Sequence, residues 1–119
     1  MHALIIEDEP LIALLIEDRL RALGYVTFDF AATETEAVAA ATRRCPDLIT
    51  SDVRLPEGCG IAAVETICGG GPIPVVFITA TAWQVRQRMR DAAVVEKPFV
   101  PGELDRALLA AGAARGQAG

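Results

Sequence analysis

The chain opens with the stretch ALIIEDEP (residues 3–10), in which four apolar residues are followed at once by three acids and a proline. A short apolar run of this kind is typical of a strand that is buried on both faces of a parallel sheet. Pro10 suits the first turn of a helix, and apolar residues then recur at helical spacing as far as Leu23, just before Gly24. The stretch therefore predicts a buried strand, an acidic loop and a helix.

The same alternation of strand and helix continues along the rest of the chain. Further strands are predicted at residues 25–31, 48–52, 73–79 and 93–96, and further helices at 33–44, 61–68, 82–90 and 101–111. Such an alternation predicts one α/β domain with a parallel sheet covered by helices on both faces. We expect this single domain to span residues 1–119, with residues 112–119 as a frayed tail.

Composition narrows the range of functions. The 119 residues are 52% hydrophobic and 23% charged, which is a globular composition, and the formal net charge is −5. An acidic balance argues against a nucleic-acid partner, and an aromatic content of only 5% argues against base stacking. No apolar run reaches the length of a membrane span, and no basic region precedes the first apolar run as in a signal peptide. We therefore expect a cytoplasmic protein without a membrane or nucleic-acid partner.

The cysteines do not indicate a disulfide framework or a zinc site. Cys45, Cys59 and Cys68 are odd in number and show no CxxC spacing. We expect them to be free, buried thiols in a reducing compartment.

The carboxyl ends of the predicted strands carry carboxylates, one hydroxyl and one ammonium. These residues are Glu7, Asp8, Glu9, Asp52, Thr79 and Lys97. Ligands of doubly wound parallel sheets bind at this edge. Clustered carboxylates repel one another unless a cation neutralises them, and Mg²⁺ commonly uses carboxylates together with a phosphate. The hydroxyl and the ammonium suit phosphoryl oxygens, and a carboxylate can itself be a nucleophile. The pattern predicts a site for Mg²⁺ and a phosphoryl group.

Lysine usage supports this prediction. Ten of the 11 basic residues are arginine, and the only lysine, Lys97, lies at a predicted strand end. The alternative is that Lys97 is a solvated surface charge.

Four segments carry a resemblance to a known family: LIIEDEP (4–10), DLITSDVRLP (47–56), PVVFITA (74–80) and EKPF (96–99). With these segments in this order, residues 3–111 resemble a response-regulator receiver domain, the CheY-like phosphoacceptor module of two-component signalling. The resemblance implies a flavodoxin-like fold with five parallel strands in the order 2-1-3-4-5.

The resemblance also implies a role for each site residue. Asp52 would be the phosphoacceptor, Asp8 would bind Mg²⁺ directly, Glu7 would bind it through water, and Arg54 would contribute its backbone carbonyl. Thr79 and Lys97 would hold the phosphoryl oxygens. A sensor histidine kinase or a histidine phosphotransfer protein would supply the phosphoryl group, and a downstream protein would read the result. The domain would be no enzyme apart from its own phosphorylation and dephosphorylation.

The sequence departs from the usual receiver pattern in places. Val94 stands where receivers usually have Tyr or Phe, and Trp83 is either a substitute for that ring or ordinary packing. The segment around Thr79 is similar to variant receivers with a Pro-Phe-x-Phe-Ala-Thr motif. The short distance from Thr79 to Lys97 predicts a small helix between them. Val100 cannot cap the last helix, and family members usually have a cis peptide at the position of Lys97-Pro98.

Two other functions are open alternatives. The chain could be a degenerate receiver that is never phosphorylated and serves as a binding scaffold. It could instead be a Mg²⁺-dependent phosphohydrolase with an aspartate nucleophile, although Arg54 occupies the position where such an enzyme needs a second acid. The arginines at positions 86, 88 and 90 are interpreted as a solvated helix face or a contact with a partner protein, and not as a nucleic-acid patch.

Overall fold

The computed structural model describes the backbone of residues 1–118 and the side chains of residues 1–112. Five strands form one sheet: β1 (His2–Ile6), β2 (Thr27–Ala31), β3 (Leu48–Ser51), β4 (Val75–Thr79) and β5 (Ala93–Glu96). Their spatial order is β2-β1-β3-β4-β5, and each pair of neighbours is parallel. The predicted fold class and strand order are therefore confirmed.

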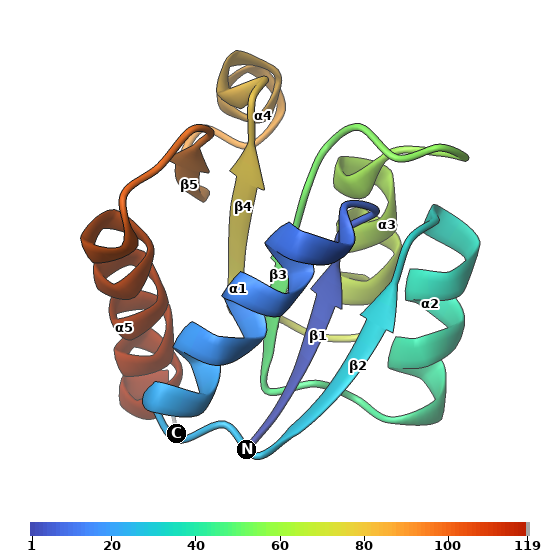
Figure 1. Ribbon diagram of the computed structural model, residues 1–119. Coiled ribbons are helices and arrows are strands. Elements are labelled where there is room, and N and C mark those ends of the chain that lie inside the picture. The colour runs from blue at the N-terminus through green and yellow to red at the C-terminus, as the bar shows by residue number, and fades with distance from the viewer. Residues whose placement is uncertain (119) are drawn as a thin grey trace.

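Helices cover both faces of this sheet, as Figure 1 shows. They are α1 (Pro10–Ala22), α2 (Glu34–Arg43), α3 (Gly60–Cys68), α4 (Ala82–Arg88) and α5 (Pro101–Ala118). Helices α1 and α5 contribute to the hydrophobic core on one face, whereas α2, α3 and α4 contribute to the core on the other. The sheet thus separates two apolar layers.

The central strand β1 shows why its sequence is a continuous apolar run. Ala3 and Ile5 point into the core beside α1 and α5, and Leu4 and Ile6 point into the core beside α2 and α3. All four residues are buried. Since successive side chains of a strand face opposite sides, burial on both faces requires apolar residues at every position. Each large aliphatic side chain buried here contributes about 1.5–3 kcal/mol.

Most predicted elements lie within a few residues of their expected bounds, but α5 does not. It continues to Ala118, whereas the sequence predicted its end near Ala111. The alanines that follow Gly112 are strong helix formers, which offsets the helix-breaking tendency of that glycine. Residue 119, the last residue of the expected frayed tail, lies outside the described residues.

Several smaller expectations can be compared with the structure. The Lys97-Pro98 peptide bond is cis, and α4 is short, with seven residues, as predicted. The three cysteines are free, but Cys45 is exposed and Cys59 and Cys68 are only partly buried, so the expectation of buried thiols was wrong. Cys45 follows the end of α2, where the chain turns outside both apolar layers. In the described part of the chain, no helix has the length and apolar character needed to cross a lipid bilayer.

Candidate functional site

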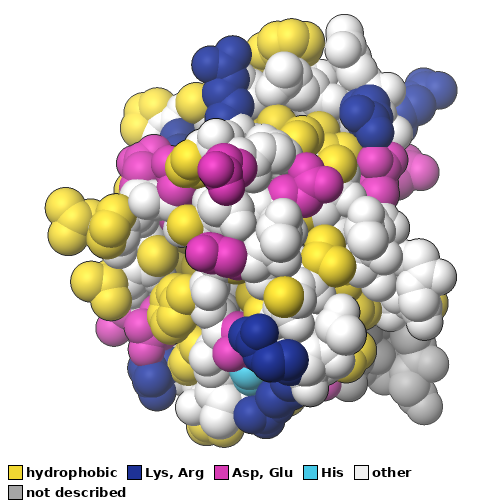
Figure 2. All heavy atoms as spheres, turned by 90° about the vertical axis from the view of Figure 1, so that its right-hand side faces the viewer, with side chains coloured by type: hydrophobic (Ala, Val, Ile, Leu, Met, Phe, Trp, Pro, Cys, Tyr) yellow, Lys and Arg dark blue, Asp and Glu magenta, His cyan; other side chains and the backbone are white. Residues whose placement is uncertain are grey.

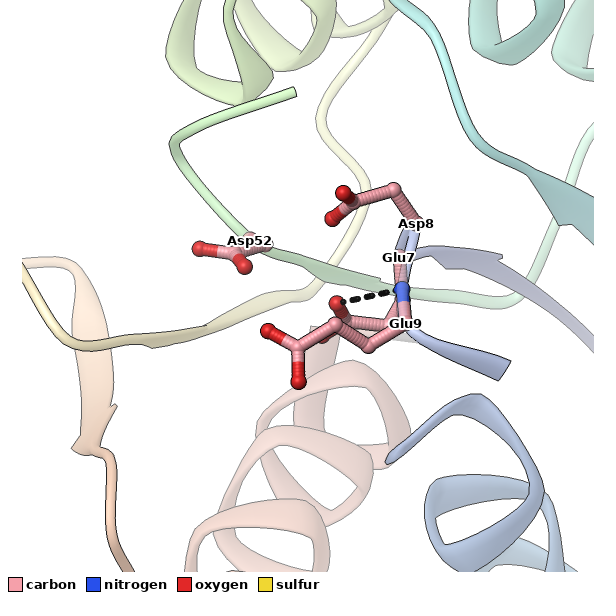
Figure 3. Close-up of side chains that lie close together, drawn as sticks. All are labelled: Glu7, Asp8, Glu9 and Asp52. Atoms are coloured by element: carbon pink, nitrogen blue, oxygen red, sulfur yellow. Dashed lines mark hydrogen bonds between the residues drawn. The ribbon is translucent and has the colours of Figure 1, made fainter. Parts of the chain in front are cut away.

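Four carboxylates gather at the carboxyl edge of the sheet, where the chain leaves β1 and β3 (Figure 3). They belong to Glu7, Asp8, Glu9 and Asp52, and each offers an oxygen within 4.8 Å of the others. The register of the two strands explains the proximity. Ile6 pairs with Ser51, and the Asp52 amide donates to the Ile6 carbonyl at 2.9 Å. The residues that follow each strand therefore emerge side by side.

Glu7 is the most deeply buried acid of this group. Its side chain is 0% exposed, and its Oε2 accepts a hydrogen bond from the Glu9 amide at 3.2 Å. Burial raises the pKa of Glu7, and the hydrogen bond from Lys97 acts in the opposite direction without cancelling that effect. Asp52 is also buried, whereas Glu9 is exposed. One side of the site is therefore buried, and the other is exposed to solvent.

The ammonium of Lys97 lies among these acids. Its Nζ donates to Glu7 Oε1 at 2.9 Å and to Asp52 Oδ2 at 3.0 Å, and it lies 3.6 Å from Glu9 Oε1. Burial alone would lower the pKa of Lys97, but the hydrogen bonds to Glu7 and Asp52 outweigh it and leave the pKa raised. Lys97 is thus held in its charged form as the counterion of two buried carboxylates.

Both carboxylate oxygens of Asp52 are engaged by donors. Oδ1 accepts the backbone N–H of Val53 at 2.7 Å, and Oδ2 accepts the Lys97 ammonium. Two donors on different atoms fix the plane of the carboxylate. Asp52 is therefore oriented by the fold and does not rotate freely in solvent.

The hydroxyl of Thr79 is directed to the start of α4. Thr79 Oγ1 accepts the Thr81 amide at 3.1 Å and lies 3.1 Å from Thr81 Oγ1. The Thr79 carbonyl accepts the Lys97 amide at 2.9 Å, so the two predicted phosphoryl-binding residues are neighbours through their backbones. Thr79 is buried, and its side chain connects the site to the chain segment that leads into α4.

Other residues discussed from the sequence lie around this centre. The Arg54 side chain is exposed, and its backbone pairs with that of Cys59, so the role of its carbonyl toward Mg²⁺ stays a prediction. Val94 is half-buried and pairs with Phe77. Trp83 is 56% exposed and lies at the surface of α4 instead of in the core. The sequence placed Glu9 among the strand-end carboxylates without an individual role at the metal, and the structure brings its carboxylate into the same cluster.

The donor set fits Mg²⁺. Four carboxylates from two loops lie around one ammonium, that of Lys97, in the ion pairs of the described residues. The site therefore carries an excess of negative charge. Carboxylate oxygens are the ligands that Mg²⁺ prefers, usually one or two of them with water and a phosphate. Glu7, Asp8 and Asp52 would hold the ion, and Glu9 is close enough to take part.

Comparison with known proteins gives a consistent result. The family model of the response regulator receiver domain matches residues 3–109. The chain is 39% identical over 105 residues to the phyllosphere-induced regulator PhyR of Methylorubrum extorquens, covering 85% of this chain and 39% of that protein. It is 37% identical over 107 residues to the transcriptional regulatory protein PdtaR of Mycobacterium tuberculosis, covering 87% of this chain and 52% of that protein. The chain thus spans about half or less of the length of these curated relatives.

A solved structure agrees with the sequence matches. The solution structure of the receiver domain of the Erythrobacter litoralis PhyR response regulator superposes with a TM-score of 0.84 at 38% sequence identity. That match covers 92% of this chain and 88% of the solved one.

Proposed function

Since this chain belongs to the response regulator receiver domain family, we propose that Asp52 is its phosphoacceptor and that Mg²⁺ assists at the neighbouring acids. Receiver domains are regulatory modules of two-component signalling, and the chain is such a module. One observation carries the choice of Asp52. It is a buried carboxylate that is oriented by two donors and lies within reach of both the acidic cluster and Lys97.

The phosphoryl transfer that follows from this arrangement forms one bond and breaks one bond. A carboxylate oxygen of Asp52 attacks the phosphorus of a phosphohistidine, a P–O bond forms, and the P–N bond breaks with its electron pair passing to the imidazole. Mg²⁺, when bound, supplies positive charge that offsets the charge of the phosphoryl oxygens. The loops after β1 and β3 would supply its ligands, and the Val53 amide would keep the Asp52 carboxylate in place during the attack.

Lys97 and Thr79 would stabilise the product. The Lys97 ammonium already contacts Asp52, so it can donate to a phosphoryl oxygen attached there. Thr79 would exchange its contact with Thr81 for a phosphoryl oxygen, and this exchange would alter the start of α4. A two-state element next to a new charge is the usual basis of a phosphorylation switch.

The partners in this proposal are proteins. A sensor histidine kinase or a histidine phosphotransfer protein donates the phosphoryl group, and a downstream protein target reads the altered surface. Family membership supports both partners and a cytoplasmic location.

Intact mass spectrometry tests the proposal directly. The protein is incubated with Mg²⁺ and acetyl phosphate, and the wild type is expected to gain one phosphoryl group that is absent in Asp52→Asn and after chelation. Asp18→Asn, which removes a carboxylate from the surface of α1, serves as the control and should still be phosphorylated. Absence of the adduct, with acetyl phosphate and with a kinase, would favour the scaffold alternative. Multiple turnover of added phosphate esters would favour the phosphohydrolase.

A further inference from the structure

The loop that leaves the proposed phosphoacceptor is closed at its base by its own backbone. It runs from Val53 to Cys59, and the Gly60 amide donates to the Val53 carbonyl at 2.8 Å. Arg54 and Cys59 form an isolated antiparallel bridge across it. These contacts join the two ends of the loop to each other, but they do not attach the loop to the rest of the domain.

Val53, Leu55 and Cys59 pack against the core beside α2 and α3. Glu34, the first residue of α2, adds hydrogen bonds that attach the loop to the domain. Glu34 Oε1 accepts the backbone N–H of Cys59 at 3.0 Å, and the Glu34 amide donates to the Glu57 carbonyl at 3.1 Å. Figure 1 shows the loop after β3 passing above α3 toward the upper end of α2. The two hydrogen bonds run in opposite directions, so together they clamp the loop to α2.

Gly58 makes room for this clamp. Its φ is +93°, and a Cβ at this position would lie 2.5 Å from both Cβ and Oε1 of Glu34. Only a residue without a side chain permits that backbone conformation and that approach. The loop is therefore shaped around the Glu34 side chain at the position next to Cys59.

We propose that Glu34 is a positioning residue for the phosphorylation site, setting the loop that carries the Arg54 carbonyl and thereby the affinity for Mg²⁺. This inference rests on the proposed function, in which that carbonyl is a metal ligand. Arg54 lies two residues after Asp52 in the clamped loop, and its side chain is exposed. Its backbone is held by the packing of Val53 and Leu55 on either side and by the bridge to Cys59, whose amide donates to Glu34.

The test must separate the hydrogen bond from the charge. Acidic side chains form a band across the upper part of the face made by α2 and α3 (Figure 2), so removing any of them alters the local potential. Glu34→Ala removes both the acceptor and the charge, whereas Glu34→Gln removes the charge and keeps an oxygen that can accept the Cys59 amide. Glu57→Gln removes a charge from the same loop and leaves the backbone contact of Glu57 with Glu34 intact.

Two readouts are measured on the full chain, at temperatures well below unfolding. One is hydrogen exchange of the Cys59 amide without metal, and the other is the affinity for Mg²⁺ by titration. Glu34→Ala should speed the exchange and weaken Mg²⁺ binding about three- to tenfold, the size of one lost hydrogen bond. Glu34→Gln and Glu57→Gln should each stay within about twofold of the wild type in affinity. Gly58→Ala, which displaces the Glu34 side chain, should reproduce Glu34→Ala.

Three results would overturn the inference. One is an unchanged Cys59 exchange rate in Glu34→Ala, and a second is faster exchange with unchanged Mg²⁺ affinity. The third is an equal loss of affinity in Glu34→Ala, Glu34→Gln and Glu57→Gln, which would assign the effect to charge alone. Failure of the proposed function is distinguishable, because the wild type would then lack the phosphoryl adduct whatever the exchange and Mg²⁺ titrations show.

Discussion

Gly60 lies directly against the backbone carbonyl oxygen of Asp52, so closely that a methyl group on Gly60 would overlap it. The same methyl group would also come within 2.6 Å of Ser51 Oγ, which donates to that carbonyl oxygen at 2.8 Å. The first residue of α3 is therefore in contact with the backbone of the proposed phosphoacceptor. The position of this helix and the position of Asp52 are coupled.

Gly60→Ala is expected to impair both stability and phosphorylation. The added methyl group must displace α3 or the Asp52 backbone, and such overpacking costs about 1–3 kcal/mol. Urea unfolding measures the stability, and intact mass measures the rate of phosphorylation by acetyl phosphate. Gly102→Ala is the matched control, because its Cβ meets only the Arg106 guanidinium at an ordinary 3.5 Å. Equal behaviour of the two variants would contradict the coupling.

Lys97→Met should make stability strongly dependent on pH. The variant leaves the fully buried Glu7 side chain without its counterion, a loss of about 3 kcal/mol for a buried pair. The pKa of Glu7, already raised above 4.5 by burial, should rise further when the hydrogen bond from Lys97 is gone. Because folded Glu7 then binds its proton more tightly than unfolded Glu7, stability falls as the pH rises through the folded pKa.

Urea unfolding of Lys97→Met over a range of pH, with a chelator present, checks this prediction. The free energy of unfolding of the variant should be close to that of the wild type in acid and increasingly lower than it toward neutral pH. Lys97→Arg, which keeps the charge, should show a smaller loss. A constant difference between Lys97→Met and the wild type across the range would show that Glu7 does not titrate as described.

Thr79→Val should separate phosphorylation from the response to it. Valine has nearly the shape of threonine but lacks the hydroxyl that contacts Thr81, so Asp52 should still accept the phosphoryl group, at a rate reduced by about tenfold at most. The only tryptophan, Trp83, lies on α4 four residues after Thr79 and reports on that helix by fluorescence. The change on phosphorylation should be lost in Thr79→Val and kept in Thr79→Ser. A full fluorescence change in Thr79→Val would exclude Thr79 from the switch.

Asp105→Asn should remove a contribution to stability that is present at neutral pH and absent in acid. Arg19 donates two hydrogen bonds to Asp105, at 2.9 and 2.8 Å, and they lower the pKa of Asp105 below its ordinary 3.8. A lowered folded pKa contributes stability above the ordinary value, and this contribution is lost as the pH falls through the folded pKa. Thermal unfolding of both proteins should therefore converge at low pH. A difference that does not change with pH would contradict this assignment.

The sheet and the centre of the site could be predicted because local patterns determine them. A strand buried on both faces needs a continuous apolar run, so the end of β1 and the acids after it are visible in residues 3–9. The carboxyl ends of parallel strands lie at one edge of the sheet. The ends of β1, β3 and β5 were therefore enough to predict that Glu7, Asp52 and Lys97 lie close together.

The sequence could not show contacts that have no period or motif. The bond from Glu34 to the Cys59 amide joins residues 25 apart, and the pair between Arg19 and Asp105 joins residues 86 apart. Nothing in the local pattern of either partner indicates the other. The partner of the Thr79 hydroxyl was equally hidden, because side-chain rotation is decided by packing around β4 and α4 and not by spacing along the chain.

The hydrogen bond between Lys97 and Glu7 spans 90 positions of the chain and has a consequence for folding. Acids from the first loop stay without their counterion until β5 has docked at the edge of the sheet. Of the five strands, β5 is the last to leave the ribosome. A nascent chain ending before Lys97 therefore holds an uncompensated acidic cluster and cannot form the charge-balanced centre. If Asp52 is the phosphoacceptor, as proposed, the domain would therefore become competent for phosphorylation only when the sheet is complete.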